Sequence, residues 1–176
     1  MDRLSPEQDL LGTRNDLCVR LARSEREVAT AQELRFSVFY EELKASPDTA
    51  ASHSRRDADR FDAFCDHLIV VRRTAGNEAG KFGVDDGEMV GTYRLLRQSV
   101  AEQNGGFYTQ SEFDIAPLLA AKPALKFLEL GRSCVLKQYR TKPVVELLWQ
   151  GIWNYVRHHG MDVMLGCASL EGTDHR

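Results

Sequence analysis

The sequence predicts a mixed α/β domain whose sheet is antiparallel in its early strands and becomes parallel at its last two. Two observations predict this fold class. Apolar runs of strand length alternate with two segments of helical periodicity, in the order β-α-β-β-β-α-β. The second helical segment lies between the last two apolar runs, and a crossover helix of this kind joins parallel neighbours. We therefore expect a sheet that is flanked by helices.

Composition narrows the class of protein. The chain has 176 residues, 43% of them hydrophobic and 28% charged, so it can bury a core of its own without disulfides or metal. A formal net charge of −3 argues against nonspecific binding to nucleic acid. The first residues lack the layout of a signal peptide, and no apolar run reaches the roughly 20 residues that span a bilayer. We expect a cytoplasmic protein without a nucleic-acid partner.

The four cysteines indicate neither a metal site nor a disulfide framework. Cys18, Cys65, Cys134 and Cys167 stand far apart, with no CxxC pair and no histidine at ligand spacing. Buried, reduced thiols are the expectation, and no metal ligand is predicted.

A polar N-terminal segment precedes the first strand and helix. Residues 1–16 predict a flexible arm, and residues 17–176 predict the folded domain. Alternation over Leu17–Leu21 is typical of a strand. Ser24 followed by Glu27 has the spacing of a capping box, so we expect a helix to begin there.

Polar residues on this helix and beyond it form a first candidate group. Arg35 and Phe39 lie four apart, so on a helix they point the same way. Residues 44–60 have little periodicity and predict a long, mobile connection. An acidic cluster that includes Asp59 and Asp62 overlaps and follows this connection. A solvated acidic loop is the alternative to a binding role for these carboxylates.

Four further apolar runs predict strands, at residues 67–72, 89–96, 127–136 and 161–170. Gly, Asn and Asp residues between the first two of these runs predict a hairpin, so this pair should be antiparallel. Residues 97–123 predict short helical turns. Pro143 suits the first turn of a helix and Gly160 its end. Trp149 and Trp153 on that helix are expected in the core or in the wall of an acyl pocket, and the core is favoured.

Several charged residues interrupt or border the apolar runs, which indicates a cleft. Arg35, Arg94, Glu129 and Arg132 each have a simpler explanation, because a buried arginine usually pairs with a buried acid. Glu129 and Arg132 would face opposite sides of an uninterrupted strand. A β-bulge near Gly131 would re-aim these side chains and leave a strand N–H free for an oxyanion.

The basic turn before the second helix predicts an anion site. Backbone N–H groups over residues 140–144 lie at a helix N-terminus, beside Lys137, Arg140 and Lys142. Such a turn would hold a phosphate. A solvated basic turn is the alternative.

Resemblance to a known family rests on five ordered segments: LRFSVFYEEL, DRFDAFCDHLIVV, VGTYRLLR, FLELGRSCVLKQYRTKPVVELLWQGIW and MLGCASL. Together they resemble the GCN5-related N-acyltransferase fold, and within it the bacterial L-ornithine N-alpha-acyltransferases, over about Leu17 to Gly172. The resemblance implies transfer of a 3-hydroxyacyl group from acyl carrier protein to the α-amine of L-ornithine, giving lyso-ornithine lipid. It implies no cofactor beyond the acyl-4'-phosphopantetheine of the carrier. A lipid product also implies transient contact with a membrane surface, peripherally at the inner membrane.

The resemblance also implies roles for individual residues. Acyl-homoserine lactone synthases share these segments more loosely. Their Arg and Phe pair matches Arg35 and Phe39, and their D-x-x-D matches Asp59 and Asp62. Their strand arginine matches Arg94, and their E-x-x-R matches Glu129 and Arg132. Substrate binding is expected at Arg35, Phe39, Asp59, Asp62 and Arg94, and catalysis at Glu129 and Arg132. Donor binding is expected at Val135, Lys137, Arg140, Thr141, Lys142 and Val144. Glu129 is the expected base, directly or through a water, because burial favours a carboxyl that can hold a proton.

Three departures from the family pattern refine these expectations. Ala45 stands where the lactone synthases have a tryptophan, which favours the amino-acid acyltransferases. The turn at 138–143 lacks the glycines of the acetyl-coenzyme A enzymes, which favours a carrier protein over coenzyme A as donor. Family members continue past GCASL with a further helix and strands, so we expect the domain to be incomplete at its C-terminus.

Two alternatives stay open. One is an enzyme of the same fold with another acceptor, either an acyl-homoserine lactone synthase or another N-acyl amino acid synthase. The other is a non-catalytic remnant that binds acyl carrier protein through Lys137, Arg140 and Lys142.

Overall fold

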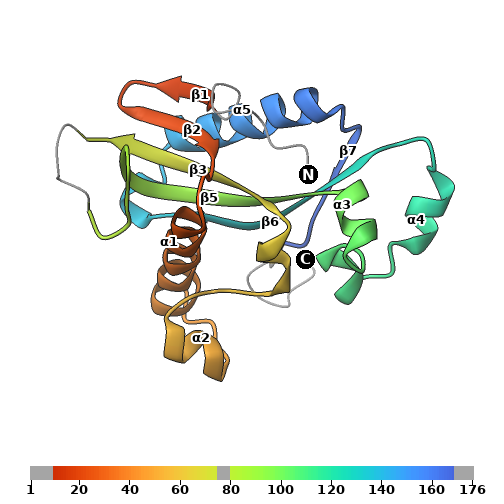
Figure 1. Ribbon diagram of the computed structural model, residues 1–176, viewed down its shortest axis with the longest axis horizontal. Coiled ribbons are helices and arrows are strands. Elements are labelled where there is room, and N and C mark those ends of the chain that lie inside the picture. The colour runs from red at the N-terminus through yellow and green to blue at the C-terminus, as the bar shows by residue number, and fades with distance from the viewer. Residues whose placement is uncertain (1–9, 75–79, 169–176) are drawn as a thin grey trace, which may run out of the picture.

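A twisted seven-stranded sheet runs through the centre of the protein (Figure 1), in a computed structural model that describes residues 10–74 and 80–168. The strands are β1 (Leu10–Arg14), β2 (Leu17–Leu21), β3 (Asp66–Arg73), β4 (Gly83–Val84), β5 (Gly87–Arg97), β6 (Phe127–Val135) and β7 (Val163–Leu165). Their order is β1-β2-β3-β5-β6-β7, with β4 paired to β5. All pairs are antiparallel except β6 and β7, which are parallel. The predicted change of strand direction is confirmed.

The helices divide between the two faces of this sheet. They are α1 (Glu25–Phe36), α2 (Thr49–Ser54), α3 (Gln98–Gln103), α4 (Ala116–Ala121) and α5 (Lys142–His159). Short 3-10 turns occur at η2 (Arg60–Ala63), η3 (Tyr108–Ser111) and η4 (Lys137–Tyr139), and a π-helical turn, η1 (Ser37–Glu42), continues α1. Figure 1 shows α1 on one side of the sheet and α5 on the other. The short turns α3, η3 and α4 confirm the helical turns predicted over residues 97–123.

Alternate side chains of β3 pack into two separate hydrophobic clusters, one on each face of the sheet. Leu68 and Val70 pack into the cluster under α5, whereas Ile69 and Val71 pack into the cluster under α1. All four are fully buried. Successive side chains of a strand point to opposite faces, so a strand covered on both sides has an unbroken apolar sequence.

Helix α5 lies directly on the sheet at a glycine. A Cβ added at Gly151 would lie 2.7 Å from a methyl of Val19, so no larger residue fits there without displacement. Trp149 and Trp153 stand two residues to either side, which places each about 160° around the helix from Gly151. Their exposed fractions are 49% and 57%. The expectation that these tryptophans lie in the core is therefore wrong, because the helical period turns them outward.

The first strand replaces part of the expected flexible arm. Residues 1–9 of that arm lie outside the described part of the chain, but Leu10–Arg14 pair with β2 as β1. The side-chain amide of Asn154 on α5 donates to the carbonyl of Leu11 over 2.7 Å. This strand extends the sheet and rests against α5.

The connection at 44–60 is more ordered than its sequence predicted. It contains α2, whose first turn is capped by Asp48 accepting a hydrogen bond from the Ala51 N–H. Its last residues bind the arginines described below. The long, mobile connection is therefore a wrong expectation, because caps and ion pairs replace the missing apolar periodicity.

Over residues 10–74 and 80–168, no helix is both long and apolar enough to cross a membrane.

Replacing Gly151 by Leu is expected to lower the free energy of unfolding by about 1–3 kcal/mol, because extra side-chain volume in a packed interface forces its neighbours apart. Urea denaturation followed by circular dichroism measures the change. Val145→Leu, which adds volume at an exposed position of the same helix, should change it by less than about 0.5 kcal/mol. Equal stability of Gly151→Leu and the parent would contradict the tight contact.

Candidate active site

A buried ionic network begins at Arg35, in the last turn of α1. Its Nε donates to Asp57 over 2.9 Å, and one terminal nitrogen contacts both carboxylate oxygens of Asp62 at 3.0 and 2.8 Å. The same terminal nitrogen donates to the carbonyl oxygen of Asp57. Arg35 is only 1% exposed, so this charge depends on its two aspartates for compensation.

The D-x-x-D spacing has a local structural cause. Asp59 caps the 3-10 turn η2, where its side chain accepts from the N–H of Phe61 over 2.8 Å. Asp62 accepts in return from the N–H of Asp59 over 3.1 Å. This reciprocal pair is a capping box, which holds both carboxylates on one side of the turn.

Two strand arginines complete the network. Arg94 on β5 donates to Asp59 at 2.6 Å and to Asp62 at 3.3 Å. Arg132 on β6 donates to Asp57 and Asp59, each at 3.1 Å. The simpler explanation of these arginines, that they pair with buried acids, is confirmed, and the alternative of a solvated acidic loop is wrong.

Charge compensation sets the ionisation of Asp62. Burial alone would raise the pKa of this carboxyl, but the charge and hydrogen bond of Arg35 outweigh burial and lower it to about 2. The pKa of Arg132 is raised, because Asp57 and Asp59 outweigh the opposing effect of burial. Both groups are therefore fully charged near neutral pH.

A β-bulge on β6 gives Arg132 its position. Thr92 pairs with Cys134, and the next ladder pair joins Arg94 to Gly131, so β6 advances by three residues where β5 advances by two. Arg132 lies in this extra segment with a φ of 52°, in the left-handed region. A side chain in that region costs about 1–2 kcal/mol, which its ion pairs offset. The bulge predicted near Gly131 is confirmed.

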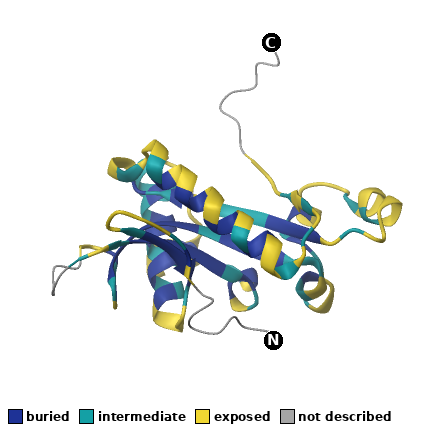
Figure 2. Cartoon of the chain, turned by 90° about the horizontal axis from the view of Figure 1, so that it is seen from above, coloured by how far each residue is buried: buried dark blue, intermediate teal, exposed yellow. Residues whose placement is uncertain are grey.

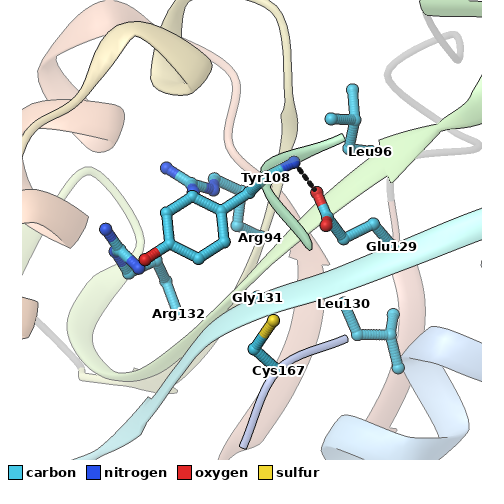
Figure 3. Close-up of a pocket in the computed structure, with 8 residues that line it drawn as sticks. All are labelled: Arg94, Leu96, Tyr108, Glu129, Leu130, Gly131, Arg132 and Cys167. Atoms are coloured by element: carbon cyan, nitrogen blue, oxygen red, sulfur yellow. Dashed lines mark hydrogen bonds between the residues drawn. The ribbon is translucent and has the colours of Figure 1, made fainter. Parts of the chain in front are cut away.

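The bulge borders a small cavity (Figure 3), lined by Arg94, Leu96, Tyr108, Glu129, Leu130, Gly131, Arg132 and Cys167. Its volume is about 40 Å³, enough for a water molecule or two. Glu129 and Arg132 line the same cavity although they are three residues apart on β6. The bulge has thus brought together the two residues that we expect to act in catalysis.

Glu129 is bound by a loop that sequence reasoning missed. One carboxylate oxygen accepts from the N–H of Tyr108 at 2.9 Å. The other accepts from the N–H and hydroxyl of Thr109, at 2.6 and 2.5 Å. Three donors therefore hold this buried carboxylate, which ties η3 to β6.

Tyr108 and Cys167 also line the cavity, although the sequence did not indicate them as site residues. The Arg132 guanidinium lies 5.0 Å from the centre of the Tyr108 ring, a cation-π contact. Figure 3 shows the Tyr108 ring beside Arg132. It shows Cys167 near Gly131. Cys18, Cys65 and Cys134 are buried as expected, but Cys167 is exposed, which corrects the expectation for that thiol. A Gly-Gly turn before an aromatic and a threonine was the only sequence sign of this loop.

The remaining candidate substrate residues lie at different depths. Asp59 contacts both cavity arginines, whereas Asp62 contacts Arg94 and pairs with Arg35, which does not line the cavity. Phe39 lies in the π-helical turn η1 and packs against the core under α1, and it is not among the cavity-lining residues.

The expected donor site lies at the start of α5. Lys137 and Lys142 are exposed, but Arg140 makes a bidentate pair with Glu42 at 2.6 and 2.8 Å. Thr141 is the N-cap residue, without a side-chain capping bond.

Several backbone donors of the same turn are already engaged. The backbone N–H groups of Arg140, Thr141 and Val144 donate to carbonyls within the turn. The carbonyl of Val135 accepts from the side-chain Nε of Arg140. The Val144 side chain lies in the core under α5. Phosphate recognition at this turn would therefore depend mainly on its lysines.

Comparison with known proteins gives three findings. Residues 34–150 match the family described as the acetyltransferase (GNAT) domain. L-ornithine N(alpha)-acyltransferases from Rhizobium meliloti (strain 1021) and Agrobacterium fabrum (strain C58) are 51% and 50% identical over 96% and 94% of this chain. Each alignment covers 55% of the relative, so the chain spans about half the length of the curated relatives that it matches. FeeM, an N-acyl amino acid synthase from uncultured soil microbes, shares the fold, with a TM-score of 0.55, 12% identity and coverage of 84% of this chain and 68% of that one.

Replacing Asp62 by Asn is expected to lower the free energy of unfolding by about 3–5 kcal/mol at pH 7, because it leaves buried arginines without a full counter-charge. Urea denaturation measures the loss. Asp85→Asn is the matched control, since Asp85 pairs with Arg26 at 3.3 Å on the surface. The control should lose less than about 1 kcal/mol.

The same pair of proteins tests the ionisation of Asp62. Its folded pKa of about 2 lies below the ordinary 3.8. Stabilisation by this charge is therefore complete above about pH 4 and is lost as the pH falls from there toward 2. The stability of the parent should fall more steeply over this window than that of Asp62→Asn. Parallel pH curves for the two proteins would refute the assignment.

Proposed function

Because the chain belongs to the GNAT acetyltransferase domain family, we propose that it transfers an acyl group from a thioester to an amine. We propose further that the acceptor is the α-amine of L-ornithine and the donor a 3-hydroxyacyl group on acyl carrier protein. The proposal that ornithine is the acceptor rests on two relatives named L-ornithine N(alpha)-acyltransferase, which are 51% and 50% identical to this chain. The product would be lyso-ornithine lipid.

The arginines at the cavity support binding of an amino-acid carboxylate. Arg132 is partly exposed, with 24% of its side chain accessible, and two of its nitrogens contact aspartates. A planar guanidinium can bind a carboxylate through two parallel hydrogen bonds. Asp59, 25% exposed, is the partly accessible acid of the network and would receive the side-chain ammonium of ornithine.

The proposed reaction is direct transfer. The deprotonated α-amine attacks the thioester carbonyl, a C–N bond forms, the C–S bond breaks and the carrier thiol departs. The ammonium loses two protons in all, one to Glu129 and one to the leaving sulfur. A carboxylate has about four acceptor positions, and Glu129 uses three of them, so one position remains for the amine or a relaying water.

The distorted strand supports a place for the oxyanion. A bulge interrupts the ladder between β5 and β6, and a backbone N–H in the segment from Gly131 to Val135 would donate to the thioester oxygen. The cavity is too small for a whole ornithine, since ligand pockets generally measure about 300–1,000 Å³. Only the reacting amine and carbonyl would enter it.

The donor would approach along the turn before α5. Lys137 and Lys142 supply exposed positive charge for the single phosphate of a carrier-bound pantetheine. The working compartment would be the cytoplasm, with transient contact at the inner membrane because the product carries an acyl chain.

The decisive assay incubates the purified protein with 3-hydroxyacyl carrier protein, S-adenosylmethionine and a mixture of amino acids that includes ornithine, and identifies products by mass spectrometry. Acyl-ornithine is the expected product. An acyl-homoserine lactone or another acyl amino acid would overturn the acceptor. Carrier binding without any product would indicate a non-catalytic binding domain.

The role of Glu129 can be separated from that of the loop it holds. Glu129→Gln should lower kcat by about 10²-fold or more, because the amide cannot accept the proton. Thr109→Val removes one donor to the same carboxylate but keeps the carboxylate, so it should lower kcat far less. If the two variants lose kcat equally, Glu129 is a positioning residue and not the base.

A further inference from the structure

The outer face of α5 carries an apolar stripe that the fold does not cover. Val145, Trp149 and Trp153 follow one another at intervals of four residues, and their exposed fractions are 46%, 49% and 57%. We call these three residues the α5 outer stripe. Figure 2, which views the molecule from above, shows exposed residues alternating with buried ones along the whole of α5.

This stripe contains both tryptophans of the chain. Tryptophan is highly buried on average, so two on one solvent-facing helix surface need an explanation that a single exposed apolar residue does not. Phe113 and Leu118 are also exposed, but they lie in the separate η3–α4 region. The exposed apolar side chains of α5 therefore form a patch that is separate from the η3–α4 region.

Cations border the stripe. Arg157 continues the same row of four-residue intervals beyond Trp153, and Lys142 lies one turn before Val145; both are exposed. Glu146 is the acidic residue of α5, and it pairs with Arg14 at 2.5 Å and with Lys142 at 3.6 Å. Lys142, Arg157 and Arg14 are thus three cations against the one carboxylate of Glu146. This face is locally positive, although the whole chain has a formal net charge of −3.

We propose that the α5 outer stripe binds the interface of an anionic lipid bilayer, with the helix lying parallel to the membrane plane. Tryptophan has an apolar body and one N–H donor, which suits the boundary between head groups and acyl chains. Helices that lie in this boundary combine such side chains with cations that attract anionic lipids. The inference rests on the proposed function in one respect, since a lipid product gives the enzyme a reason to reach the bilayer.

The position of α5 fits this occupant. The helix lies on the side of the sheet opposite α1 (Figure 1), and the three stripe residues are exposed, so a surface that approaches this side can contact them. A second copy of the chain is the competing occupant, and it would bury the same tryptophans without lipid.

Tryptophan fluorescence tests the proposal directly, because every emitting tryptophan lies on the stripe. Vesicles of phosphatidylglycerol and phosphatidylcholine should shift the emission to shorter wavelength, and brominated acyl chains should quench it. Raised salt should weaken binding, because it screens the cations of the helix. No shift and no quenching would overturn the proposal.

Vesicle sedimentation with variants supplies the matched comparison. Trp149→Ser with Trp153→Ser should lower the bound fraction at least about tenfold, while Phe113→Ser with Leu118→Ser should leave it unchanged. Arg157→Glu should weaken binding to anionic vesicles but not to neutral ones. Equal binding by the tryptophan and control variants would overturn the proposal, as would a stable dimer whose tryptophans are shielded without lipid.

The two proposals can fail separately. Vesicle binding is measured without substrates, so an enzyme with another acceptor would still bind. Acyl-ornithine formation from a short, soluble acyl donor is measured without vesicles, so a protein that never binds lipid could still make it.

Discussion

Burial of arginine charge is the constraint on which the rest of this structure depends. Arg35 and Arg94 lie almost wholly out of water, and an unpaired ion in such a place would cost several kcal/mol. Their counter-charges come from one short segment around η2, since Asp62 contacts both arginines. The network therefore joins α1, η2, β5 and β6 into one unit. The segment before β3 is held by these charges together with the packing of Phe61 and Cys65 into a hydrophobic cluster that also contains Phe127.

Arg132 connects this supporting network to the cavity. Its bulged, left-handed backbone would be unfavourable alone, but its guanidinium bridges Asp57 and Asp59 and lies over the Tyr108 ring. The bulge also turns Arg132 toward the cavity that Glu129 lines. Stability and site geometry thus share the same contacts, so a change in the aspartates should affect both. This sharing explains how the surface that we propose as the active site can include a strained residue.

Much of the candidate site followed from residue chemistry before its geometry was known. Buried arginines need acids, so the pairing of Arg94 and Arg132 with the aspartates could be anticipated, as could a bulge near Gly131. The hydrogen-bond partners of Glu129 could not, because they come from a loop twenty residues earlier whose approach has no local sign.

Local signals decided where the main strands and helices begin and end, because caps, proline, glycine and periodicity act within a few residues. Ser24 caps α1 and Gly160 ends α5 for this reason. Only the tertiary structure decided which face of α5 is buried, where Leu10–Arg14 pair, and which loop holds Glu129. These features depend on surfaces that are distant in sequence. An apolar residue such as Trp153 has the same hydrophobicity on either face of a helix, and the close contact at Gly151 determines which face meets the sheet.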